Sequence, residues 1–148
     1  MSDHIIKDQA AFEKENLFGT GDLNTGYARY FIGNSYLKGL TDKSYPLSAA
    51  NVTFEPGCRN NYHIHHAKSG GGQLLLCVAG SGWYQEAGKP PVSLNPGDVV
   101  AIPANVKHWH GAKKNSWFSH IAISVPGEDT HTEWCEPVSD EEYDKLPE

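Results

Sequence analysis

Glycine and proline divide the central part of this chain into short segments, and this spacing limits the folds that it can adopt. The sequence holds 15 glycines and 9 prolines, and the segments between them are rich in β-branched and aromatic residues, which favour strands. Short strands about 8–12 residues apart are typical of a β-sandwich or barrel. No helical segment of about 10–15 residues lies between them, which argues against a parallel α/β sheet. The predicted strands are residues 27–33, 48–55, 59–65, 73–79, 82–86, 98–102, 107–111 and 117–125.

Two short helices are predicted at the ends of the chain, over residues 8–18 and 139–146. The second opens with a capping box, in which Ser139 is followed three residues later by Glu142. The sequence therefore predicts an all-β fold with short terminal helices.

Length and charge argue against several functional classes. A chain of 148 residues is long enough for one domain with its own core. The net charge of −6, and basic stretches no longer than Lys113-Lys114, disfavour nucleic-acid binding. No apolar run approaches the roughly 20 residues of a membrane span, and the N-terminus lacks the apolar core of a signal peptide. The three cysteines are widely spaced and indicate no disulfide framework. We therefore expect a cytoplasmic protein that binds neither nucleic acid nor membrane.

Six of the eight histidines lie between positions 63 and 120, and four of them form alternating pairs. His63 and His65 are two residues apart, as are His108 and His110. Because successive side chains of a strand point to opposite faces, the members of each pair share a face. Imidazole is the commonest metal ligand in proteins, so two such strands side by side could hold one ion.

The histidine pairs belong to two spaced motifs. The first is Gly57-x5-His63-x-His65-x7-Gln73-x6-Gly80, and the second is Gly97-x5-Pro103-x-Asn105-x2-His108. Together they resemble the two signature motifs of the cupin superfamily of small jelly-roll barrels, also called double-stranded β-helices. The resemblance implies a single-domain cupin barrel in which His63, His65, His108 and Gln73 are the metal ligands.

This chain departs from the family pattern at four points. Gln73 stands where the family usually has glutamate, and seven residues rather than three or four separate it from His65. The longer gap contains Ser69–Gly72, which we interpret as a flexible loop beside the site. Asn105 replaces a glycine and Ala112 an asparagine in the second motif.

A narrower resemblance extends over roughly residues 50–143. Segments such as Pro96-Gly97-Asp98-Val99-Val100 and the tail from Trp134 to Tyr143 are similar to the small bacterial cupins labelled carboxymuconolactone-decarboxylase-like. That group includes manganese-dependent hydroxynitrile lyases, which also use a glutamine ligand. The resemblance implies that His120 acts as a general base. His110 shares a face with His108, so we expect it near the metal as a second residue that handles protons.

The predicted ligands constrain the cofactor and the reaction. Three neutral imidazoles and a neutral amide cancel none of the charge of a divalent ion. The ion therefore stays a strong Lewis acid, which favours chemistry on a small carbonyl or carboxylate compound. The resemblance favours manganese or iron, and the donor set also suits nickel or zinc. We expect a lyase that cleaves or forms a C–C bond or removes a carboxylate, or an isomerase. An iron dioxygenase and a non-catalytic module that binds a metal or a small ligand remain alternatives.

Strand alternation also predicts a partner. Leu74, Leu76 and Val78 share one face of their strand, and Ile121 and Ile123 share one face of theirs. These faces are too apolar for contact with water, so we expect a homodimer. Within the single domain we expect an N-terminal arm with the first strands (residues 1–46), a barrel core (47–138) and a C-terminal helix and tail (139–148).

Overall fold

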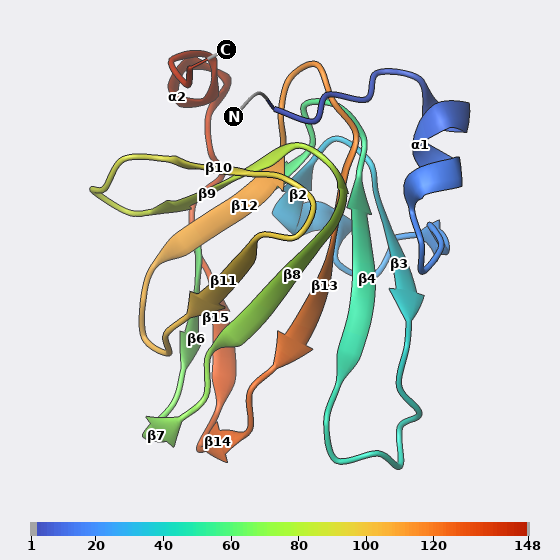
Figure 1. Ribbon diagram of the computed structural model, residues 1–148. Helices are drawn as coiled ribbons and strands as arrows, with labels where there is room; N and C mark the ends of the chain where they lie inside the picture. The colour runs from blue at the N-terminus through green and yellow to red at the C-terminus, as the bar shows by residue number, and fades with distance from the viewer. Residues whose placement is uncertain (1–2, 148) are drawn as a thin grey trace.

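The computed structural model describes residues 3–147, which form two facing antiparallel β-sheets with a short helix at each end of the chain (Figure 1). The predicted all-β fold is confirmed. The first sheet has six strands, in the order β1 (Asp22–Leu23), β3 (Ser35–Gly39), β4 (Ala49–Phe54), β13 (Phe118–Ser124), β8 (Gln73–Gly80) and β11 (Val99–Ile102).

The second sheet has seven strands. Its main path is β10 (Val92–Leu94), β9 (Gly82–Glu86), β12 (His108–Ala112), β5 (Arg59–Asn60) and β2 (Phe31–Ile32). The other two strands are β6 (His63–His66), which pairs with β12, and β15 (His131–Trp134), which pairs with β6. A separate two-stranded ribbon joins β7 (Ser69–Gly70) to β14 (Gly127–Glu128).

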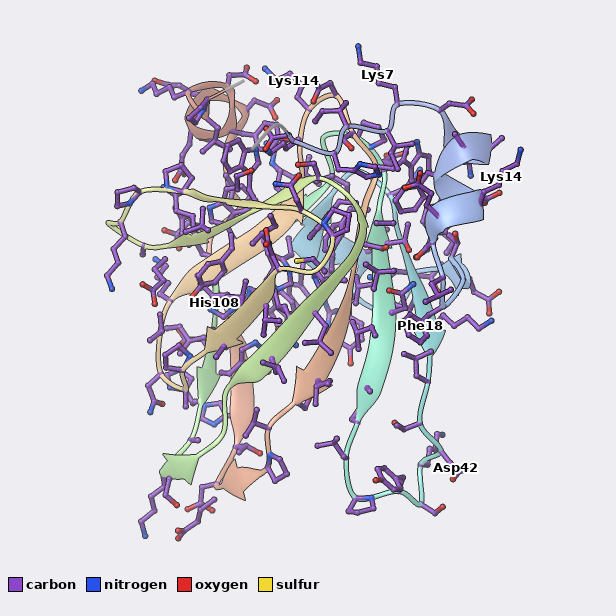
Figure 2. All side chains as sticks on the ribbon, viewed as in Figure 1. Lys7, Lys14, Phe18, Asp42, His108 and Lys114 are labelled. Carbon is purple, nitrogen blue, oxygen red and sulfur yellow. The ribbon has the colours of Figure 1, made fainter. Side chains whose placement is uncertain are left out.

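The core lies between the two sheets, because alternate residues of their strands point inward. Phe54 of β4, Leu75 of β8 and Phe118 of β13 are fully buried there. Each such side chain contributes roughly 1.5–3 kcal/mol through burial. Figure 2 shows side chains filling the space between the sheets.

Both terminal helices form where the sequence predicts them, but they are shorter. In α1 (Gln9–Glu15), the side chain of Asp8 accepts a hydrogen bond from the backbone of Ala11. Phe12 of this helix stacks on Trp117. This contact places α1 over part of the outer face of the six-stranded sheet. In α2 (Asp140–Asp144), Ser139 accepts from the backbone of Glu142, as the capping box predicts.

The segment 27–33, expected to be a strand, is mostly a turn. It forms a 3-10 helix, η1 (Ala28–Tyr30), followed by the two residues of β2. The prediction of a continuous strand was wrong because Tyr30 donates its backbone N–H to Tyr27 within a local turn instead of pairing across a sheet.

The loop expected at 69–72 is also more regular than predicted. Its first two residues pair with β14, and the next two are glycines with positive φ angles. A Cβ on Gly71 would lie 2.6 Å from that of Ala67, and one on Gly72 would lie 2.4 Å from the carbonyl oxygen of Ile102. The glycines therefore allow a tight turn into β8 rather than a loose loop.

Part of the outer face of the six-stranded sheet beyond α1 remains partly exposed. Leu74, Leu76, Ile121 and Ile123 are half-buried there. The second copy expected to cover this face stays a prediction. None of the helices within residues 3–147 is long and apolar enough to cross a membrane.

Candidate metal centre

Three histidines meet where β6 and β12 lie side by side. The register pairs His108 with His63, and their ring centroids are 4.2 Å apart. His65 lies on the same face of β6, with its ring 5.0 Å from that of His63 and 5.3 Å from that of His108. His66 points to the opposite face and contacts Glu133 at 2.7 Å, as expected for a residue outside the site. Strand alternation thus brings the three predicted imidazoles together.

Gln73 approaches these imidazoles from the facing sheet. It is the first residue of β8 and lines the same cavity as His63 and His65. The structure therefore brings all four predicted ligands to one region, despite the longer gap between His65 and Gln73.

The hydrogen bonds of the three imidazoles leave one nitrogen of each facing inward. Nδ1 of His63 lies 2.8 Å from the carbonyl oxygen of Asn61, and Nδ1 of His108 lies 2.9 Å from that of Val106. A carbonyl oxygen can only accept, so each Nδ1 carries the proton and each Nε2 keeps its lone pair. Nδ1 of His65 is 3.3 Å from the hydroxyl oxygen of Thr132. An Nδ1–H that donates to a backbone carbonyl, as in His63 and His108, is common among metal-binding histidines.

Several buried nitrogen and oxygen atoms in the site have no hydrogen-bond partner among residues 3–147. They are Nε2 of His65, Nε2 of His108 and Oε1 of Gln73. A buried polar atom without a hydrogen bond costs roughly 1–3 kcal/mol, so native proteins seldom leave three of them together. Two imidazole nitrogens and an amide oxygen suit a divalent transition-metal ion, which would satisfy all three.

His110 belongs to this cluster as well. Within residues 3–147, one group of three histidine, cysteine or acidic side chains has ligand atoms all within 4.8 Å of one another, and it consists of His63, His108 and His110. His110 was expected only as a second proton-handling residue. The packing therefore makes His110 an alternative to His65 as the third metal-binding imidazole.

His110 and His120 form a buried pair behind the cluster. Nε2 of His120 lies 3.0 Å from Nδ1 of His110, so one imidazole donates to the other. Asn60 holds His110 from the far side. Its Oδ1 accepts from the backbone N–H of His110 at 3.0 Å, and its Nδ2 lies 3.3 and 3.4 Å from the two ring nitrogens.

Burial keeps these histidines uncharged. It lowers the pKa of His108 to about 4 and that of His120 to about 3, and it lowers the pKa of His65 as well. The pKa values of His63 and His110 fall well below 6.5, first through burial and then through their histidine neighbours. Neutral imidazoles are the form that binds a metal or accepts a proton.

These shifts predict that acid destabilises the metal-free protein. The unfolded chain takes up protons on its histidines near pH 6.5, whereas the folded state resists until about pH 4 at His108. We expect the free energy of unfolding to fall as the pH drops through this range, by roughly 3 kcal/mol from His108 alone. Urea unfolding at several pH values measures the effect, and His120→Phe should reduce the slope. A constant free energy between pH 7 and pH 4 would contradict the prediction.

The cluster opens into a cavity of about 230 Å³ whose lining mixes polar and apolar side chains. His63, His65, Gln73, His110 and His120 line it, and so do the apolar side chains of Phe31, Leu37, Val52 and Trp134. Trp134 lies directly beside His63, with their ring centroids 4.7 Å apart. A small compound that carries both polar and apolar groups therefore fits the cavity.

Sequence reasoning missed several residues that shape this site. Asn60 carries no motif, although it follows Arg59 in a predicted strand and lies three residues before His63. Thr132 and Trp134 lie in β15, a strand that was not predicted. Alternation within residues 131–134 was the available signal, because it places both side chains on the face opposite His131 and Glu133.

Comparison with known proteins agrees with the cupin motifs in the sequence. A family model described as a cupin domain matches residues 50–121. The chain is also similar to a protein named (R)-mandelonitrile lyase from Granulicella tundricola, with 38% identity over 127 residues. That alignment covers 84% of this chain and 94% of the relative.

Solved structures agree on the fold. A cupin-like protein from Thermotoga maritima has a TM-score of 0.77 and 40% identity, and the match covers 89% of this chain and 97% of that one. The DMSP lyase DddQ from Ruegeria pomeroyi, with a TM-score of 0.57 and 21% identity over 81% of this chain and 59% of that one, shares the fold alone.

Proposed function

Because this chain belongs to the cupin family, we propose that it is a metal-dependent lyase that cleaves or forms the C–C bond of small α-hydroxynitriles. The main support is the set of unpartnered donor atoms of His65, Gln73 and His108 beside the neutral pair of His110 and His120. The reaction class comes from the (R)-mandelonitrile lyase relative, which aligns over most of both chains.

The ligands that we propose are His63, His65, Gln73 and His108, with manganese or iron favoured and nickel or zinc as the alternatives. A divalent ion held there would supply Lewis acidity toward the substrate oxygen. Because Gln73 is uncharged, the ligands would cancel none of the charge of the ion, which favours an anionic oxygen in the site.

The histidine pair performs the proton transfer in this proposal. His120 accepts the proton of the substrate hydroxyl at Nδ1, which has no hydrogen-bond partner in the described part of the chain, while Nε2 stays bonded to His110. The oxygen lone pair then forms the carbonyl bond, and the C–C bond breaks with its electrons leaving on cyanide. The proton passes from His120 to cyanide, giving an aldehyde and hydrogen cyanide. The reverse sequence forms the C–C bond.

Metal analysis combined with turnover tests this function. We expect stoichiometric transition metal in the purified protein and release of benzaldehyde from mandelonitrile without consumption of oxygen. Loss of activity on chelation, with recovery on addition of Mn²⁺ or Fe²⁺, would support the proposed cofactor. A fully metal-loaded protein that releases no aldehyde would overturn the lyase function, and oxygen uptake that requires Fe²⁺ would favour a dioxygenase.

A further inference from the structure

We propose that Tyr27 and Trp134 form an aromatic subsite that selects substrates with an aryl group. This inference rests on the proposed lyase function and names the substrate class of that site. Both residues line the cavity, yet both lie outside the region 50–121 that matches the cupin domain. The subsite is therefore a property of the flanking segments.

Trp134 is held in a fixed orientation beside the cluster. It lies directly opposite His63 in the register of β6 and β15, and their ring centroids are 4.7 Å apart. Tyr30 stacks on Trp134 at 4.4 Å with an interplanar angle of 4°. The indole is thus preorganised and loses little freedom when a substrate binds.

Tyr27 leaves much of its ring free for contact. It lines the cavity although 52% of its surface is exposed. Its ring centroid is 6.4 Å from that of Trp134, with the planes tilted by 42°. Asn24 accepts from the backbone N–H of Tyr27 at 3.2 Å, which anchors the turn that carries the ring. An exposed aromatic ring at a cavity wall is well placed to contact a ligand.

The position of the subsite orients the substrate. His63, His65 and Gln73 line the cavity together with the three aromatic residues. The ring centroids of Tyr27 and Phe31 each lie 6.4 Å from that of Trp134, so the three rings form one aromatic group. A hydroxynitrile with its oxygen toward the histidines would therefore place its substituent against the aromatic rings. An aryl substituent gains ring–ring contacts there that a methyl group of similar polarity cannot make.

The test compares Tyr27→Ala with Tyr45→Ala, a matched control whose ring is 59% exposed and lies outside the cavity lining. We expect Tyr27→Ala to raise the KM for mandelonitrile about tenfold with little change in kcat, and to leave the KM for acetone cyanohydrin unchanged. Tyr27→Phe should restore the wild-type KM, because the ring rather than the hydroxyl makes the contact. Equal effects on both substrates, or none, would overturn the inference.

A binding measurement separates this inference from the lyase function. Benzyl alcohol is an unreactive aryl probe, and its affinity for the metal-loaded protein can be measured by ligand-observed NMR. We expect weaker binding to Tyr27→Ala than to the wild type and Tyr45→Ala. If that difference appears but no hydroxynitrile is cleaved, the aryl subsite stands and the lyase function fails. If mandelonitrile is cleaved but Tyr27→Ala neither binds the probe more weakly nor shows the KM effect, the lyase function stands and the subsite fails.

Discussion

Replacing His120 with alanine should reduce turnover by about 10²–10⁴-fold while the metal content stays at the wild-type level. The magnitude is that of losing a positioned general base. His120 is fully buried, its Nε2 lies 3.0 Å from Nδ1 of His110, and its Nδ1 has no hydrogen-bond partner among residues 3–147. It also lies outside the group of three histidines whose ligand atoms are close together. Single-turnover rates and metal analysis of the same preparation measure both quantities.

His66→Ala provides the matched control for this experiment. His66 is a histidine of the metal-binding strand β6, but it contacts Glu133 on the outer side. Its replacement should change neither turnover nor metal content. Unchanged turnover in His120→Ala would remove this residue from the mechanism, and loss of metal would instead identify it as a ligand.

The central part of the site was predictable because it depends on local rules. Alternation along a strand is enough to place His63 and His65 on one face, and the paired motif implied that His108 would join them. The capping box at Ser139 likewise depends on a contact between neighbours in the sequence. The structure brings the three histidine rings together, and Ser139 caps α2.

The aromatic residues of the cavity lining were not predictable in this way. Trp134 meets His63 only because β15 pairs with β6, although the two residues are 71 positions apart in the chain. Tyr27 lies in a turn that was expected to be a strand, so its contact with Trp134 depends on a bend that local propensity did not indicate. Contacts of this kind are set by tertiary pairing, which overrides propensity in short segments.

The position of Gln73 shows how an unusual spacing is accommodated. Seven residues between His65 and Gln73 would leave a wide range of positions for the amide if the segment were a loose loop. The pairing of β7 with β14 and the glycine turn into β8 restrict that range. The ribbon therefore offsets the longer gap and returns Gln73 to the cavity.

His65→Ala should lower the affinity for metal by more than about 100-fold and abolish turnover, whereas His110→Ala should retain the metal. Removing a residue that only supports a metal ligand typically lowers the metal affinity by roughly 10–100-fold. A larger loss therefore indicates a ligand, and a smaller one a supporting residue. The pair of variants is informative because the predicted ligands include His65, whereas the group of three side chains whose ligand atoms all lie within 4.8 Å of one another includes His110 instead. The unpartnered Nε2 of His65 supports the first assignment.

Competition with a chelator of known affinity measures both variants, and circular dichroism confirms that each is folded. The reverse result, with metal lost from His110→Ala and kept by His65→Ala, would make His63, His108 and His110 the ligands. His110 could then no longer serve as a proton-handling partner of His120, because its lone pair would be committed to the ion.

Gln73→Glu independently tests whether an uncharged fourth ligand strengthens the Lewis acidity of the ion. A carboxylate should bind the ion more tightly yet lower turnover, because it cancels one unit of the positive charge that polarises the substrate oxygen.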